Sequence, residues 1–175
     1  KALFNENCAA CHAPGGAGRP NFPVLADDDW LWGGTLAAIE QTVRHGIRST
    51  DPDTRVNIMP NFGTDAVLTA GQIGDVANYV LSLSGQKNDA AATQRGTKIF
   101  ADNCVHCHRE KGEGKREVGA PRLAGRAHLY GDDRATVEAQ VTNPRMGVLP
   151  TCSARLDVAT IKSLTLYVHA LGGGE

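Results

Sequence analysis

Two short motifs contain the residues best suited to chemistry. They are CAACH, at residues 8–12, and CVHCH, at residues 104–108. In a C-x-x-C-H motif the two thiols bond to the vinyl groups of a porphyrin, and the following histidine is placed to ligate the iron. The spacing therefore predicts two covalently attached haem c groups. The attachment residues are Cys8, Cys11, Cys104 and Cys107, and the proximal iron ligands are His12 and His108.

Two other chemistries use the same cysteine spacing. A zinc ribbon places two C-x-x-C pairs around one metal, and such pairs are usually much closer in sequence than these. A thioredoxin-like site needs one pair inside a βαβ pattern, and the sequence shows no such strands. Because the whole five-residue motif occurs twice, we interpret both copies as haem attachment motifs.

The two methionines of the chain are candidates for the sixth iron ligands. Met59, in NIMPNFG, stands before a proline that stiffens the loop, and a thioether ligand favours ferrous iron. In the second half, NPRMGVLPTC has Leu149 where a methionine is expected, and leucine has no lone pair for coordination. Met146 lies three residues upstream. The sequence predicts Met59 as a ligand of the first haem and Met146 as a ligand of the second.

Alternatives remain open at both positions. A core-filling role would also explain Met59. For the second iron, the alternatives to Met146 are a five-coordinate or water-bound state, a histidine ligand, or a thiolate from the unpaired Cys152. The histidines in question are His128 and His169. Each has an ordinary structural explanation as well: His128 at the haem edge, His169 in packing or at the surface, and Cys152 as a small buried residue.

The chain contains one unit twice. LFNENCAACH, from residue 3, aligns with IFADNCVHCH, from residue 99, and WLWGGTLAAIEQTV aligns with HLYGDDRATVEAQV. The closing LTAGQIGDVANYVLSLSG aligns with LDVATIKSLTLYVHALGG. An extra segment, RSTDPDTRVN, stands before Met59 in the first half only. The repeat and the polar GQKNDAAATQ stretch predict a first domain at residues 1–86, a linker at 87–94 and a second domain at 95–175.

Hydrophobic periodicity predicts helices in both halves. Three apolar stripes at helical spacing run through TLAAIEQTVRHG, TAGQIGDVANYVLSL and DVATIKSLTLYVHAL. Thr69 and Asp157 are expected as N-caps, and Gly46 as a helix stop. Aromatic residues make up only 5% of the 175 residues, so apolar side chains alone would build thin cores. We expect two small all-α domains, each wrapped around one haem.

Charge and hydropathy limit the partners. The formal net charge is −1, which gives no electrostatic basis for binding nucleic acid. No apolar run approaches the roughly 18–20 residues that span a bilayer. Because the counterpart of Gly96 would precede Lys1, we expect the natural sequence to continue upstream.

Over its whole length the chain resembles the periplasmic dihaem region of subunit P, the FixP-type subunit, of cbb3-type cytochrome c oxidases. WLWGG and YVHALGGG carry this resemblance more specifically than the haem motifs do. It implies two tandem class I cytochrome c-type domains at the periplasmic face of the bacterial inner membrane, anchored by an upstream transmembrane helix. It also implies that the carbonyls of Pro23 and Pro121 accept hydrogen bonds from His12 and His108.

The resemblance implies electron relay. Electrons would pass from a soluble donor cytochrome c towards the other cbb3 oxidase subunits, with no oxygen-reducing site in this chain. The alternatives are a free periplasmic dihaem carrier similar to cytochrome c4, a dihaem peroxidase, or a gas-binding haem protein that uses an open second iron.

Two further sets of contacts are expected. Phe4 should pack on Tyr79, and Phe100 on Tyr167, where the first and last helices of each half meet. Arginines are candidate partners of haem propionates, because guanidinium matches carboxylate geometry. These are Arg44, Arg122 and Arg126, each with a solvated surface position as the alternative.

Overall fold

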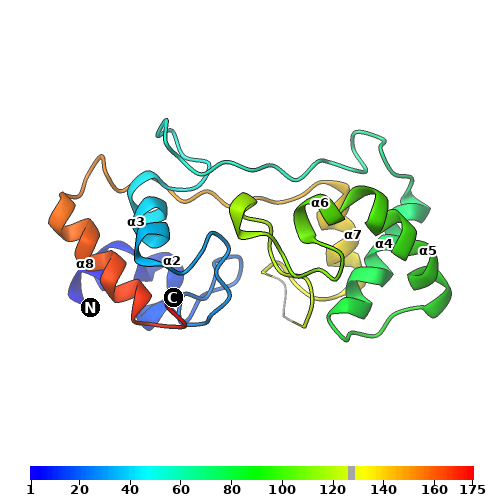
Figure 1. Cartoon of the computed structure of the whole chain (residues 1–175), viewed down its shortest axis with the longest axis horizontal. Coiled ribbons are helices and arrows are strands. Elements are labelled where there is room, and N and C mark those ends of the chain that lie inside the picture. The colour runs from blue at the N-terminus through cyan, green and yellow to red at the C-terminus, as the bar shows by residue number, and fades with distance from the viewer. Residues whose placement is uncertain (126–128) are drawn as a thin grey trace. The chain divides into compact units, whose positions relative to one another are not determined.

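The computed structural model describes residues 1–125 and 129–175 (Figure 1). Its helices are α1 (Ala2–Asn7), α2 (Ala9–His12), α3 (Leu36–His45), α4 (Ala70–Leu83), α5 (Ala90–Asn103), α6 (Val105–His108), α7 (Arg134–Thr142) and α8 (Val158–His169). Two 3-10 turns cover Pro14–Gly16 and Arg116–Val118. The β pairing seen in this part of the chain consists of isolated bridges and includes no strand. The predicted all-α fold is confirmed.

Short polar side chains begin the longer helices where the sequence predicted. Thr69 caps α4: its side chain accepts a hydrogen bond from the backbone N–H of Gln72, and the Gln72 side chain accepts one from the backbone N–H of Thr69. Asp157 caps α8 by accepting from the backbone N–H of Thr160. Gly46 ends α3 with a φ of 75°, a left-handed conformation that glycine adopts without strain.

The chain forms two compact units, and each combines parts of both sequence halves. Unit 1 contains residues 1–57, 116–118 and 147–175, and unit 2 contains residues 58–115 and 119–146. Helices α1, α2 and α3 therefore share unit 1 with α8, from the end of the second half (Figure 1). Unit 2 holds α4 to α7. The compact units thus differ from the predicted division at residues 1–86 and 95–175.

The predicted linker is shorter than expected. Residues 90–94, placed in the linker from their composition, form the first turn of α5. Asp89 caps this helix by accepting a hydrogen bond of 2.8 Å from the backbone N–H of Ala92. A cap followed by residues of good helix propensity favours a helix over a flexible linker.

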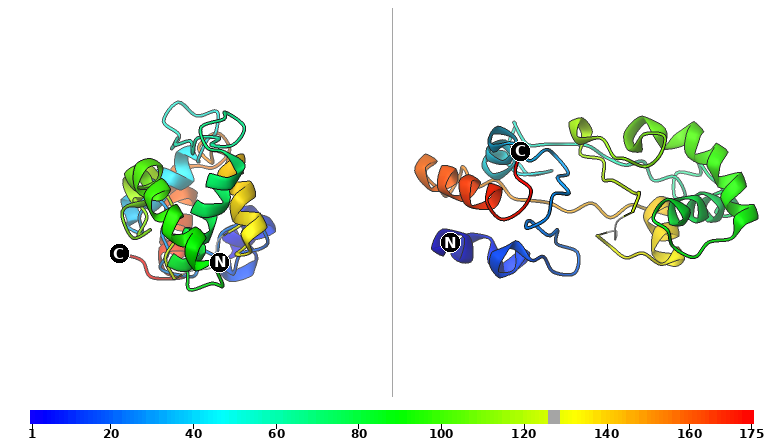
Figure 2. Two further views of the ribbon diagram at one scale, coloured as in Figure 1. Left: turned by 90° about the vertical axis from the view of Figure 1, so that its right-hand side faces the viewer. Right: turned by 60° about the horizontal axis from the view of Figure 1, so that its bottom comes forward.

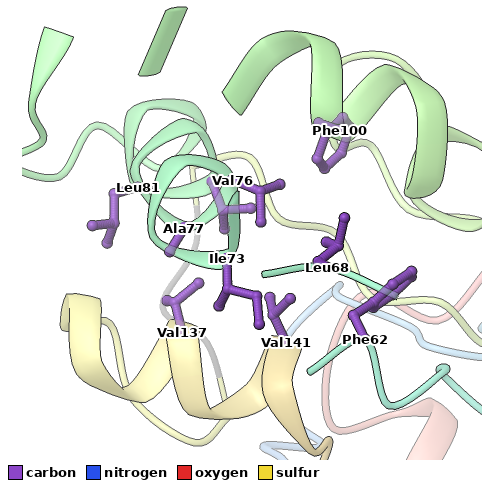
Figure 3. Packing of buried hydrophobic residues seen from close by; sticks show 10 residues of the cluster. Phe62, Leu68, Ile73, Val76, Ala77, Leu81, Phe100, Val137 and Val141 are labelled. Carbon is purple, nitrogen blue, oxygen red and sulfur yellow. The ribbon is translucent and has the colours of Figure 1, made fainter. Parts of the chain in front are cut away.

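Unit 2 has a core in which α4 packs on α5 and α7 (Figure 3). Its buried side chains come from all three helices and from the loop before α4. They are Phe62, Leu68, Ile73, Val76, Ala77, Val80, Leu81, Phe100, Val137 and Val141. Helices α4 and α5 approach so closely that a Cβ at Gly96 would lie 2.1 Å from the carbonyl oxygen of Asp75. Only glycine allows this crossing without a backbone shift.

Unit 1 has an equivalent core in which α8 packs on α1 and α3. Figure 2 shows α8 beside the N-terminal helices in a second orientation. The buried residues are Phe4, Ala9, Ile39, Leu164 and Val168. The closing glycine-rich segment also contacts the first half, because the indole N–H of Trp30 donates to the carbonyl of Gly173 at 2.9 Å.

The predicted aromatic pairs were wrong in their partners. Phe4 packs on Tyr167, with ring centroids 5.1 Å apart, and Phe100 packs on Tyr79, at 4.9 Å. The prediction assumed that each half closes on itself. In the structure α8 closes on α1 and α4 closes on α5. Tyr79 and Tyr167 occupy equivalent positions in the repeat, so the residue pattern fits either pairing.

A double-mutant cycle tests this pairing. Phe4→Leu and Tyr167→Leu should each lower the free energy of unfolding, and the two effects should be coupled by about 0.5–1.5 kcal/mol because the rings touch. The control cycle, Phe4→Leu with Tyr79→Leu, should be additive. Chemical denaturation of the three single and two double variants gives both values. Coupling in the control cycle alone would contradict the structure.

Candidate haem sites

The two C-x-x-C-H motifs adopt the same local structure. In each, the first cysteine ends one helix and begins a short second helix, α2 or α6, that carries the remaining residues of the motif. The backbone N–H of His12 donates to the carbonyl of Cys8, and that of His108 to the carbonyl of Cys104, both at 2.9 Å. This turn brings the two cysteines and the histidine of each motif close together.

Each motif histidine is oriented by a backbone carbonyl. The Nδ1–H of His12 donates to the carbonyl oxygen of Pro23 at 3.0 Å, and the Nδ1–H of His108 donates to that of Pro121 at 3.0 Å. Both contacts confirm the expectation from the resemblance. A bond of this kind fixes the tautomer and leaves Nε2 with a lone pair for a metal.

Burial affects the motif cysteines. It raises the pKa of the Cys104 thiol to about 11. It also raises the pKa of Cys8, with a smaller contribution from the nearby Cys152. Cys8 and Cys104 pack against the apolar clusters of unit 1 and unit 2.

The segment that contains Met59, residues 58–69, docks in unit 2. The backbone N–H groups of Gly63 and Thr64 both donate to the carbonyl of Thr142, at the end of α7, at 3.1 and 3.2 Å. Phe62 is buried in the core of this unit (Figure 3). Met59 is half-buried and packs against the same apolar cluster as Cys104, the first cysteine of the second motif.

The segment that contains Leu149, residues 147–157, docks in unit 1 in the same way. Leu149 and Ile47 exchange backbone hydrogen bonds of 3.0 and 2.9 Å. The backbone N–H of Ser153 donates to the carbonyl of Arg44, in the last turn of α3, at 3.1 Å. A Cβ at Gly46 would lie 2.2 Å from the carbonyl oxygen of Leu149, so the approach depends on glycine.

The extra segment of the first half, residues 48–57, holds the Leu149 segment in place. The Arg48 side chain donates from Nε to the carbonyl of Gly147 at 2.8 Å. The Asp51 carboxylate accepts hydrogen bonds from the hydroxyls of Thr151 and Ser153, both at 3.2 Å, and bonds to the His45 ring at 3.0 Å. An insertion found in one half therefore bonds to the end of the other half as well as to α3 of its own half.

The predicted site residues are distributed differently from expectation. Both methionines lie in unit 2 with His108, although Met59 was predicted to serve the haem of His12. Unit 1 holds His12 together with Leu149, so the position without a methionine lies in the first haem's unit. The reason is that the two halves exchange their end segments: the first half from residue 58 onward packs in unit 2, and residues 147–175 of the second half pack in unit 1. Met146 is half-buried and is the last residue of unit 2.

The other candidates for the second iron are not gathered around it. His169 and Cys152 both belong to unit 1. The His169 ring bonds through Nε2 to the carbonyl of Glu175 at 3.2 Å, and Cys152 is 8% exposed, as expected for a small buried residue. His128 and Arg126 lie outside the described residues.

An arginine stacked on an aromatic ring occurs in each unit, and neither pair was predicted from the sequence. The guanidinium of Arg55 lies 5.2 Å from the Trp32 ring centroid, and that of Arg145 lies 4.5 Å from the Tyr130 ring centroid. Both arginines stand four residues before the residue at the methionine position, Met59 or Leu149. That repeated spacing was the signal in the sequence. By contrast, Arg44 pairs with Glu40 at 2.5 Å, and Arg122 is exposed.

Trp32 offers a test of whether haem fits unit 1. Its indole nitrogen is buried and has no hydrogen-bond partner among the described residues. Arg55 lies over the same ring, and burial lowers its pKa. A buried N–H donor beside a cation suits an anionic acceptor, such as a carboxylate of a haem propionate. The donors, the oriented histidine and the two cysteines together fit haem c.

Comparison with known proteins gives similar sequences. The profile of the family described as Cytochrome c matches residues 1–84 and again 93–169. The chain is 53% identical to subunit CcoP of the cbb3-type cytochrome c oxidase of Cereibacter sphaeroides, over 99% of this chain and 60% of the relative. It is 52% identical to CcoP of Azospirillum brasilense, over 100% and 62%.

A third relative carries the other name of the subunit. The FixP subunit of a Bradyrhizobium species (strain ORS 278) is 52% identical to this chain, over 100% of the chain and 61% of the relative. The chain thus spans about three fifths of the length of the curated relatives that it matches.

The Asp51 contacts predict a pH-dependent stability. Hydrogen bonds from the Asp53 backbone, His45, Thr151 and Ser153 lower the pKa of Asp51 below its usual value. The stabilisation is therefore fully present above the unfolded pKa of about 3.9 and is lost as the pH falls through the lower, folded pKa. Asp51→Asn should destabilise the chain at neutral pH, and its difference from wild type should shrink as the pH falls to about 3.

Denaturation at a series of pH values measures this effect. Asp53→Asn, two residues away on an exposed side chain, is the matched control and should follow wild type throughout. An Asp51→Asn deficit that is the same at every pH would show that the carboxylate charge does not contribute.

Proposed function

The chain belongs to the cytochrome c family, and from that premise we propose that it relays electrons in a cbb3-type terminal oxidase. Two cytochrome c domains carry two covalently bound haem c groups, each of which supplies one-electron redox chemistry. The proposal rests chiefly on the duplicated site: two C-x-x-C-H motifs, each with a histidine oriented by a carbonyl at 3.0 Å. The CcoP and FixP names of the similar proteins point to the oxidase.

The residues of the chain act by holding the cofactors rigidly. Cys8 and Cys11, like Cys104 and Cys107, would fix each porphyrin through two bonds. His12 and His108 would hold the irons, and Met59 and Met146, both in unit 2, are the side chains that could offer a thioether. Trp32 Nε1 and the Arg55 guanidinium would neutralise and orient an acidic substituent of the first haem. Fixed ligands limit structural change on gain or loss of an electron, which favours relay.

The partners and the location of the chain are part of the same proposal. The partners would be the other subunits of the oxidase and a soluble donor cytochrome c. A membrane helix upstream of residue 1 would hold the two units at the periplasmic face of the bacterial inner membrane. Support comes from relatives longer than this chain. None of the helices in residues 1–125 and 129–175 is long and apolar enough to cross a membrane.

Co-expression with the remaining oxidase subunits tests this function. The full-length protein should purify with the oxidase from membranes, carry two haems per chain, and pass electrons from a reduced soluble cytochrome c to the complex. Spectra of rapidly mixed samples measure the last step. As the control, the variant Cys104→Ala/Cys107→Ala should carry one haem and slow the transfer.

Three outcomes would overturn the proposal. A chain that stays in the soluble fraction without oxidase subunits would indicate a free carrier similar to cytochrome c4. Rapid peroxide turnover by the purified protein with a reductant would indicate a peroxidase. Fewer than two haems on the wild-type chain would contradict the assignment of the motifs.

A further inference from the structure

The chain passes between the two units at the same place in both halves. Met59 corresponds to Leu149 in the repeat, and Arg55 and Arg145 each stand four residues before that position. Arg55 remains with Trp32 in unit 1, and Arg145 with Tyr130 in unit 2, so each half keeps its own arginine–aromatic pair. The unit changes after residue 57 in the first half and after residue 146 in the second. In each half, the residues that follow this point dock in the unit that contains the C-x-x-C-H motif of the other half.

The two docked segments make equivalent contacts. Gly63 and Ser153 correspond in the repeat, as do Thr142 and Arg44. The backbone N–H of Gly63 donates to the carbonyl of Thr142 in unit 2, and that of Ser153 to the carbonyl of Arg44 in unit 1, both at 3.1 Å. The exchange is thus reciprocal and ordered, and it places Met59 in unit 2 where Leu149 stands in unit 1.

We propose that Met59 ligates the iron held by His108, and that the iron held by His12 has no methionine ligand. This inference rests on the proposed attachment of haem at both motifs. Met59 packs against the apolar cluster that includes Cys104, so its thioether lies in the same unit as the second motif. Leu149, its counterpart in unit 1, has no lone pair with which to coordinate iron.

Met146 is not the ligand. It stands three residues before Leu149, as Val56 stands three residues before Met59, and it precedes the change of unit. The neighbouring Arg145 is held by Tyr130, both through stacking on the ring and through a hydrogen bond to the Tyr130 carbonyl. Gln140 also bonds to the backbone N–H of Arg145 at 3.1 Å. Ligation by Met59 would require no change in this loop.

The consequence is an inequality between the haems. A methionine ligand favours the ferrous state and raises the potential. The second haem gains this stabilisation from Met59, and the first does not. The sequence alone places the missing methionine at the second haem. The exchange of end segments places the missing methionine at the first haem instead. The resulting difference between the two haems can be measured without any oxidase activity.

Chains that carry one haem identify the ligand. Cys8→Ala/Cys11→Ala retains only the second haem and should show the thioether-to-iron charge-transfer band of the ferric protein. Adding Met59→Leu should abolish the band, and adding Met146→Leu, the matched control, should leave it unchanged. Cys104→Ala/Cys107→Ala retains only the first haem and should show no band, although both methionines are present.

A gain-of-ligand variant gives the reciprocal test. Leu149→Met should create the band in the chain that carries only the first haem, and in the two-haem protein it should double the band. A band in the first-haem chain that Met59→Leu removes would overturn the proposal, as would a wild-type band that only Met146→Leu removes. A pyridine haemochrome count on each sample separates these results from a failure of haem attachment.

A cut between residues 87 and 88 tests the exchange if a one-haem variant does not fold. A specific protease site inserted there in the two-haem protein lies between α4 and α5, which pack together within unit 2. The two fragments should elute together on gel filtration under native conditions and separate in denaturant. Fragments that separate under native conditions would show that each half closes on itself, and the ligand assignment would fall with the exchange.

Discussion

The packing of the last helix of one half on the first helix of the other is the contact on which the remaining structure depends. Phe4 is fully buried against Tyr167, and Phe100 is 1% exposed beside Tyr79. A buried aromatic side chain contributes several kcal/mol, so these two contacts determine which helices can close each core. Because α8 packs on α1 and α4 packs on α5, the loops before α4 and α8 must lie in the same unit as the helix that each loop precedes.

The insertion in the first half helps to explain why this pairing is stable. A repeat protein offers two closures that bury similar surfaces, and loop entropy alone distinguishes them weakly. Residues 48–57 make contacts available in one closure only: Arg48 bonds to Gly147, and Asp51 bonds to Thr151 and Ser153. These bonds join the start of the chain to its end within unit 1.

Each haem site combines groups that are close in sequence with a segment that is distant in sequence. The motif cysteines, the motif histidines and their proline carbonyls lie within residues 8–23 in the first half and 104–121 in the second, and each half builds this part by itself. The distal side comes from a segment far away in sequence. A single substitution at the methionine position therefore affects the haem of the opposite half, and so two copies of one motif acquire different iron environments.

The sequence by itself determined the cofactor, the helical class, the repeat and the two C-x-x-C-H motifs, because these depend on spacing within short segments. It also placed the caps at Thr69 and Asp157, which act over three residues. Only the tertiary structure decided the partners of Phe4, Phe100 and Met59. Tyr79 and Tyr167 are equivalent in type and register, so no local pattern distinguishes them. The choice comes from contacts between residues about a hundred positions apart, such as those of Asp51 with Thr151.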